Sequence, residues 1–193
     1  MDLLFFSNQQ NVYKLKASDV ADAKASALGD YLPNLLQLDA EETIIYMTAT
    51  ADYSGQMVFF FANGKAARVD LTAYKTTSNR RKLTGAYSDK APLACIRRLD
   101  TDCELAVYST EPRALIFHTA LLAPKTTRTT QGVAVMTLKP KYQLETVKAL
   151  EDTPITNQSR YRVRSLPAAG ACCGRRTPRS GRWICWTESD RKE

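Results

Sequence analysis

The feature that most constrains this 193-residue chain is a pattern that occurs three times. An aromatic or β-branched stretch, a short polar turn and a second apolar stretch appear at Leu4–Leu15, Val58–Val69 and Ala106–Phe117. Phe6 and Phe60, at equivalent positions of the first two copies, are 54 residues apart, and the next interval is 48 residues. Each copy has the composition of a β-hairpin, because such side chains favour strands and polar residues favour the turn between them.

Each hairpin is followed by the same succession of segments. About a dozen residues beyond its second strand comes a polar, often basic loop that ends in glycine, and the three loops are Lys24–Gly29, Arg80–Gly85 and Thr127–Gly132. A further short apolar strand is expected after each loop, near Leu35–Leu38, Leu93–Ile96 and Val133–Leu138. The next strand begins after an acidic turn, at Asp39–Glu42 or Asp100–Glu104.

The repeat length and strand number predict an all-β fold of propeller-like blades. Four short antiparallel strands in roughly 50 residues is the size of one blade, whereas helical repeats show a 3.6-residue apolar period. The sequence therefore predicts roughly three blades, a partial propeller. Ordinary hairpins of a β-sandwich are the alternative. Helix is expected only as one or two turns in the alanine-rich stretch Asp19–Ala27.

The same segments resemble a known family. Leu3–Asn8, with Val12–Lys16 and Pro33–Leu38, resembles one blade of the C-terminal domain of the A subunit of DNA gyrase and of its topoisomerase IV counterpart. Three later stretches resemble further parts of that domain in gyrase-like subunits of Firmicutes: Ala86–Leu93, Pro124–Val133 and Tyr161–Gly170.

The resemblance covers residues 3–170 and implies a β-pinwheel, a propeller variant whose blades exchange strands with their neighbours. It implies blades near residues 3–56, 57–104 and 105–170 within a domain of residues 1–170. It also implies a basic rim that binds and bends double-stranded DNA. Because the family's domain usually has five or six blades, the chain is interpreted as a fragment.

The resemblance implies that this chain alone is not an enzyme. The family's chain-breaking tyrosine and metal-binding acidic cluster lie in regions upstream of the part matched here, and Tyr161, between Arg160 and Arg162, is expected to be structural. The parent would be an ATP-dependent DNA topoisomerase, an isomerase, and its partners would be a breakage-reunion domain and the ATPase B subunit. Arg80–Gly85 looks like a degenerate copy of the gyrase-specific box, so supercoiling is not implied.

Charge alone does not locate a nucleic-acid site. The formal net charge is +7, but residues 160–193 hold nine Lys or Arg against three Asp or Glu, which leaves +1 for residues 1–159. The argument therefore rests on local clusters, because duplex wrapping needs cations spaced along a convex surface.

Candidate phosphate contacts are basic residues at repeat-equivalent positions. Second strands and their turns supply Lys14, Lys16, Lys65 and Arg68, and the glycine-ended loops supply Lys75, Arg80, Arg81, Lys82, Lys125 and Arg128. Any one such charge can simply solvate a surface. Recurrence in aligned loops favours a DNA role for Arg80, Arg81, Lys82, Lys125 and Arg128. Arg97 and Arg98 precede an acidic turn and are expected to pair with it.

Several other classes of site are not expected. Five cysteines without C-x-x-C spacing and a single histidine, His118, argue against a zinc site or a disulfide framework. His118 is expected to be structural or exposed, no phosphate-cradling glycine motif occurs, and no cofactor is predicted. No apolar run approaches the roughly 18 residues of a membrane span, and the N-terminus lacks the basic start of a signal peptide, so a cytoplasmic protein without membrane contact is expected.

Residues 171–193 change character, with Arg, Gly, Cys and both tryptophans and no apolar period. They are interpreted as a frameshifted translation or a disordered basic arm. Besides a DNA-binding module, two functions remain open from the sequence: a propeller-like protein-interaction scaffold and an inactive gene fragment.

Overall fold

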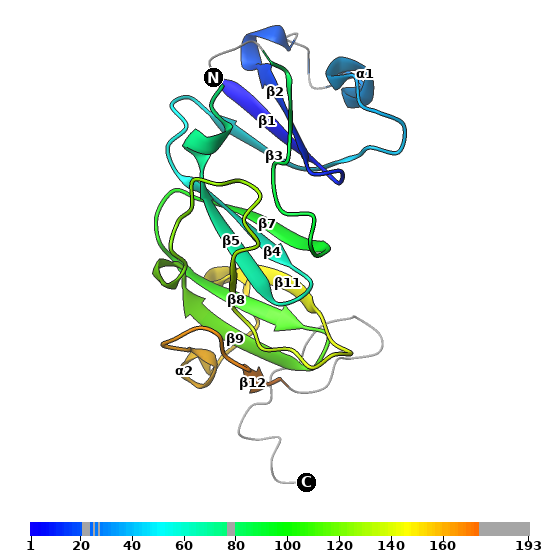
Figure 1. Ribbon diagram of the computed structural model, residues 1–193. Coiled ribbons are helices and arrows are strands. Elements are labelled where there is room, and N and C mark those ends of the chain that lie inside the picture. The colour runs from blue at the N-terminus through cyan, green and yellow to red at the C-terminus, as the bar shows by residue number, and fades with distance from the viewer. Residues whose placement is uncertain (21–23, 25, 27, 77–79, 174–193) are drawn as a thin grey trace.

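The computed structural model describes residues 1–20, 24, 26, 28–76 and 80–173, and the fold is all-β, as predicted. Three four-stranded antiparallel sheets follow one another along the molecule (Figure 1). In spatial order the first sheet consists of β3 (Ile44–Thr50), β1 (Asp2–Ser7), β2 (Asn11–Lys16) and β6 (Lys82–Thr84). The second consists of β10 (Val133–Ala134), β5 (Lys65–Asp70), β4 (Gln56–Phe61) and β7 (Leu93–Leu99). The third consists of β11 (Leu144–Ala149), β8 (Glu104–Ser109), β9 (Arg113–His118) and β12 (Ala171–Cys172).

Each sheet is completed by a strand from farther along the chain. The hairpins β1–β2, β4–β5 and β8–β9 form the centres of the sheets, as the repeats predict. The outer strand β6 follows β5 in the chain but pairs with β2, and β10 follows β9 but pairs with β5. β12, near the end of the described chain, pairs with β9. These pairings are the strand exchange that the resemblance implies.

Small helices connect the strands. Short 3-10 turns follow four of the strands: η1 (Ala17–Asp19), η2 (Leu71–Tyr74), η3 (Thr119–Leu121) and η4 (Leu150–Asp152). The two α-helical turns are α1 (Leu32–Leu36) and α2 (Gln158–Tyr161). Most of the turns expected over Asp19–Ala27, and residues 174–193 of the expected tail, lie outside the described residues.

The strand predicted near Leu35–Leu38 is wrong, because α1 extends to Leu36 and its C-cap Gln37 follows. Pro33 lies in the first helical turn, where its fixed φ suits a helix. Gln37 ends the helix with a φ of 53°, which no strand residue adopts. The edge strand of the first sheet is instead β3, which follows the acidic turn.

The sheets pack face to face through alternating side chains, since successive strand residues point to opposite faces. Phe6 of β1 meets Phe59 of β4 edge-on, with ring centroids 5.7 Å apart. On the other face of β4, Phe60 meets Phe117 of β9 at 6.4 Å. The phenylalanines of β1 and β4 are all at most 3% exposed, so they form the core rather than a base-stacking platform.

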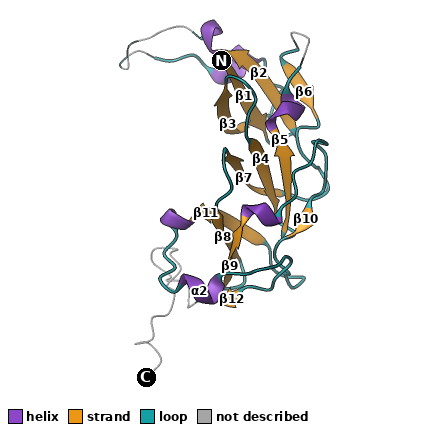
Figure 2. Ribbon diagram, turned by 90° about the vertical axis from the view of Figure 1, so that its left-hand side faces the viewer, coloured by secondary structure: helices purple, strands orange, loops and turns teal. Residues whose placement is uncertain are grey.

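The stack of sheets is curved (Figure 2). The edge strands β3, β7 and β11 lie along its inner side, and the exchanged strands β6 and β10 lie on its outer side. The loops that lead into these exchanged strands are therefore displayed on the convex side of the molecule.

Candidate nucleic-acid interface

A small basic pocket lies where β6 joins the first sheet. It has a volume of about 220 Å³ and is lined by Lys14, Lys16, Asp19, Arg80 and Arg81. Four cations therefore face one carboxylate. The two lysines come from β2, and the two arginines immediately precede β6.

Strand exchange assembles this pocket. The β2–β6 ladder pairs Tyr13 with Lys82, and the amide of Lys14 donates a 2.7 Å hydrogen bond to the carbonyl of Arg81. This bond extends the contact between the two segments beyond the strand itself. The pocket thus unites two groups of predicted site residues that are far apart in the sequence.

The four cations of the pocket differ in whether they have polar partners within the protein. The ammonium of Lys14 donates to the hydroxyl of Thr76 at 2.9 Å and lies 3.9 Å from Asp2. Lys16, Arg80 and Arg81 are exposed, and within the part of the chain that the structure describes no ion pair joins them to a carboxylate. Three of the four charges therefore face solvent, where an anion can reach them.

Lys82 has a different environment. Its ammonium lies 2.6 Å from a carboxylate oxygen of Asp39 and 3.5 Å from one of Glu42, and 5.3 Å from the ring centroid of Tyr13. The hydrogen bonds to Asp39 and to Tyr13 raise the pKa of Lys82 above its usual range. These partners neutralise its charge locally. The sequence predicts an acidic turn at Asp39–Glu42 but not its pairing with Lys82.

A second group of predicted cations surrounds η2, the turn after β5. Lys75 follows this turn and is exposed. Arg128 is half-buried, and its guanidinium contacts the carbonyl of Ala73 at 3.5 Å. Lys125 is exposed, and its backbone forms a parallel bridge with Val69 near the end of β5. The structure thus brings the loop after β9 against the segment after β5.

The remaining two candidates lie on β5. Lys65 is half-buried and pairs with Ala134 of β10. Arg68 is only 9% exposed, and its guanidinium donates to the carbonyls of Thr119 and Leu122 at 2.8 and 3.2 Å. These bonds tie the second sheet to the third, so the guanidinium of Arg68 is engaged in the fold and is not accessible to a ligand.

The pairing expected for Arg97 and Arg98 holds for only one of them. Arg98 lies 2.8 Å from Asp100 of the acidic turn. Arg97, the neighbouring residue, points to the opposite face of β7 and donates to the carbonyl of Val147 on β11 at 2.6 Å. The expectation is therefore wrong for Arg97, which links two sheets instead.

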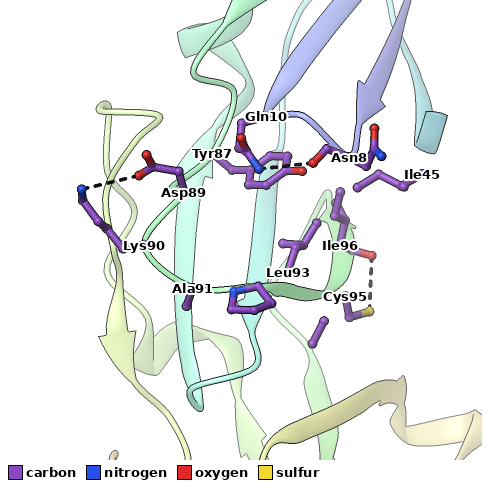
Figure 3. Close-up of a pocket in the computed structure, with 12 residues that line it drawn as sticks. Asn8, Gln10, Ile45, Tyr87, Asp89, Lys90, Ala91, Leu93, Cys95 and Ile96 are labelled. Carbon is purple, nitrogen blue, oxygen red and sulfur yellow. Dashed lines mark hydrogen bonds and ion pairs between the residues drawn. The ribbon is translucent and has the colours of Figure 1, made fainter. Parts of the chain in front are cut away.

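A larger pocket, of about 590 Å³, lies between the first hairpin turn and the segment that leads into β7 (Figure 3). Its walls are mainly apolar and include Ile45, Leu93 and Ile96. The lysine at its margin, Lys90, lies 3.9 Å from Asp89. This pocket lacks the cluster of cations that phosphate binding requires.

Other kinds of site are not found among the described residues. They contain no group of three or more His, Cys, Asp or Glu residues that could hold a metal ion. None of their helices is long and apolar enough to cross a membrane. His118 caps η3, because its Nδ1 accepts a 3.3 Å hydrogen bond from the amide of Ala120, which is a structural role.

Comparison with known proteins finds relatives with similar sequences. No protein-family model matches the chain. The chain is 24% identical over 205 residues to the DNA gyrase A subunit of Staphylococcus epidermidis, and this alignment covers 96% of this chain and 22% of the relative. It is 25% identical over 154 residues to the DNA gyrase A subunit of Borreliella burgdorferi, covering 79% and 19%. The chain thus spans about a fifth of the length of these relatives.

Solved structures with the same fold agree with these relatives. The C-terminal domain of DNA topoisomerase IV superposes with a TM-score of 0.67 at 24% identity, covering 77% of this chain and 47% of that domain. The DNA gyrase A C-terminal domain superposes with a TM-score of 0.61 at 20% identity, covering 88% and 59%. The chain therefore has the β-pinwheel fold of the C-terminal domains of the A subunit of DNA gyrase and of topoisomerase IV, and its sequence resembles the A subunit of DNA gyrase over most of its length.

Proposed function

We propose that this chain is a non-catalytic module of a bacterial type IIA DNA topoisomerase and binds double-stranded DNA through its phosphates. The observation that carries the proposal is the basic pocket, where strand exchange gathers four cations on the convex side of the stack. The exposed residues Lys16, Arg80 and Arg81 supply its accessible charge.

Phosphate chemistry fits this pocket. Each cation that neutralises a phosphate releases condensed counterions and so adds affinity that does not depend on base sequence. Arginine can pair with two phosphate oxygens at once, and lysine supplies a mobile point charge. A pocket of about 220 Å³ accommodates a phosphate group but leaves the bases outside.

The second group of cations extends the proposed surface. Lys75, Lys125 and Arg128 lie around the end of β5, in the next sheet along the stack. Lys65 lies at the start of the same strand. Cations on successive sheets of a curved stack would follow the backbone of a duplex that bends around them, as wrapping requires.

The gyrase and topoisomerase IV relatives suggest the wider setting. In a longer parent protein the module would act beside a breakage-reunion domain and together with a separate ATPase, and the parent would change DNA topology in the cytoplasm. The gene sequence upstream of codon 1 tests this part: an in-frame breakage-reunion domain supports it, and an unrelated reading frame contradicts it.

The test of DNA binding uses a duplex of ~40 base pairs and the double variant Arg80→Ala/Arg81→Ala. Affinity should fall steeply with salt for the unmodified protein, and the slope of log K against log salt should be smaller by about 2 in the variant, since about 0.9 is lost per phosphate contact. The loss should be the same for duplexes of different sequence.

Lys90→Ala/Lys141→Ala is the matched control, because it removes the same charge from exposed positions outside the basic pocket. Its salt slope should stay close to that of the unmodified protein. An equal loss in both variants, or salt-insensitive binding, would refute the proposal and favour the protein-interaction scaffold.

A further inference from the structure

The molecule contains a fully buried carboxylate that the proposed function does not use. Glu42 lies in the turn between α1 and β3, and its side chain is 0% exposed. The amide of Asn11 donates to it at 2.8 Å, the hydroxyl of Tyr13 donates at 2.6 Å, and the hydroxyl of Ser7 donates as well. These three donors come from β1 and β2, so Glu42 is bonded to both strands of the first hairpin.

The cationic partner of Glu42 comes from the next repeat. Lys82, the first residue of β6, places its ammonium 3.5 Å from Glu42 and 2.6 Å from Asp39, beside the ring of Tyr13. A buried carboxylate is costly unless it is hydrogen-bonded and paired with a cation. The ion pair between Glu42 and Lys82 therefore favours the state in which β6 is paired with β2.

β6 depends on side-chain contacts, which are the burial of Leu83 in the core and the ion pair of Lys82. It has only three residues and lies at the edge of its sheet, where a strand has a partner on one side only. Apart from the ladder itself, the amide of Lys14 donates to the carbonyl of Arg81 just before β6, and the amide of Ala86 donates to the carbonyl of Gln10 just after it. So few backbone bonds give a short edge strand little stability of its own.

The position of Arg80 and Arg81 depends on this strand, because they directly precede Lys82. We propose that Glu42 and Lys82 are positioning residues, which hold β6 on the first sheet and thereby keep Arg80 and Arg81 beside Lys14 and Lys16. On this view Lys82, which the sequence predicted as a phosphate contact, does not touch the phosphate. The inference rests on the proposed function and names the device that assembles its site.

The hydrogen-bond donors around Glu42 agree with a charged, structural carboxylate. Burial alone would raise its pKa, but the hydrogen bonds from Ser7, Tyr13 and Asn11 and the charge of Lys82 lower it to about 2. Glu42 is therefore ionised at neutral pH and retains its attraction for Lys82.

The variant Glu42→Gln tests the inference, because the two possible roles of Glu42 predict opposite changes in duplex affinity. A carboxylate that acts on DNA only through its negative charge repels phosphate, so its removal would strengthen duplex binding. If Glu42 holds β6 in place, the same change weakens binding, by about tenfold in 0.1 M salt, and lowers the salt slope by about 2, because Arg80 and Arg81 lose their positions. Binding as tight as that of the unmodified protein, or tighter, would overturn the inference.

Asp39→Asn is the matched control. It removes the same charge from the same lysine, but Asp39 is 66% exposed and the network around Glu42 stays intact. Duplex affinity should therefore stay the same or rise slightly. If Asp39→Asn and Glu42→Gln weaken binding equally, the loss does not come from the buried network and the inference is wrong.

Lys82→Met separates a positioning role from direct contact. A single lost phosphate contact lowers the salt slope by about 0.9 and adds to the effect of Arg80→Ala/Arg81→Ala. If Lys82 is a positioning residue, Lys82→Met alone lowers the salt slope by about 2. Combining it with Arg80→Ala/Arg81→Ala then lowers the slope no further. An additive loss would overturn the inference.

Hydrogen exchange tests the inference without DNA. The amides of Lys14 and Ala86 form backbone hydrogen bonds beside the two ends of β6. In Glu42→Gln these two amides should exchange at least tenfold faster, while the amides of β8 and β9 stay protected. Unchanged protection overturns the inference even if DNA binding fails for another reason. Faster exchange supports it even if the unmodified protein does not bind duplex, in which case only the proposed function fails.

If Glu42→Gln does not fold, Tyr13→Phe takes its place in the exchange experiment. This change removes one hydrogen bond to Glu42 and keeps the ring beside Lys82. The same two amides should then exchange faster, by a smaller factor.

Discussion

The guanidinium of Arg68 has oxygen partners on two sheets. Besides the carbonyls of Thr119 and Leu122, it contacts the side chain of Gln56 at 2.5 Å and a carboxylate oxygen of Asp102 at 2.8 Å. Gln56 belongs to the second sheet, and the other three partners belong to the segments that flank β8 and β9. Arg68 therefore acts as a polar link between the second and third sheets, as Arg97 does from β7.

Arg68→Met should lower the free energy of unfolding by about 3 kcal/mol, because it leaves buried carbonyl oxygens without a donor. Urea denaturation measures the change. Lys75→Met, an exposed substitution of similar size, should stay within about 0.5 kcal/mol of the unmodified protein. If Arg68→Met changes the free energy of unfolding only slightly and lowers the salt slope of duplex binding, the result would instead support the predicted role of Arg68 as a phosphate contact.

The burial of Arg68 had a partial signal in the sequence. Arg68 follows Ala66 and Ala67 and precedes Val69, so both faces of the strand carry apolar residues. Such a strand is buried on both sides, and a charged residue within it needs internal partners. Those partners come from residues around 119 and 102, which only the packed fold brings near. For Glu42 the sequence showed only an acidic turn, since its donors lie about 30 residues away.

At the scale of elements, the exchanged strand β10 depends on the glycine that precedes it. Gly132 has a φ of 71°, and a Cβ atom there would lie 2.0 Å from the carbonyl oxygen of Ala66 on β5. Only glycine combines this conformation with so close an approach of the two backbones.

Gly132→Ala should therefore displace β10 and lower the free energy of unfolding by about 2 kcal/mol or more. Gly29→Ala is the matched control, because a Cβ atom at Gly29 meets nothing within 4 Å. Thermal or urea unfolding of the two variants measures the difference. Equal stability of the two variants would show that β10 contributes little to the second sheet.

The hairpins could be predicted from the sequence, and the exchanged strands could not. The hairpins have long apolar strands with a tight turn between them, so the signal is local. β6 has three residues and β10 has two, too few for a period to appear, and each forms only because a strand of the preceding repeat lies beside it. For this reason Arg80–Gly85 was expected as a loop, although its last part contains β6.

At the scale of the whole molecule, the curvature of the stack matters for the proposed function. The candidate cations of the first and second sheets lie near exchanged strands on the convex side, so a duplex that contacts both groups must bend. Bending a short duplex costs a few kcal/mol, which the additional phosphate contacts offset.

A duplex of ~40 base pairs with a dye at each end tests this bend. Binding should bring the ends closer and raise the efficiency of energy transfer between the dyes. The increase should be smaller for Arg80→Ala/Arg81→Ala than for Lys90→Ala/Lys141→Ala at equal occupancy. Tight, salt-dependent binding without any change in transfer would mean that the duplex lies straight on the protein.

The exchange of strands also determines the order in which the sheets can be completed during synthesis. Chains leave the ribosome from the N-terminus onward, and domains fold as their residues emerge. The first sheet cannot be completed until residues 82–84 are available, the second until residues 133–134 and the third until residues 171–172. One edge of each new hairpin therefore stays open while about one further repeat or more is made, and the order of synthesis is also the order in which these edges close.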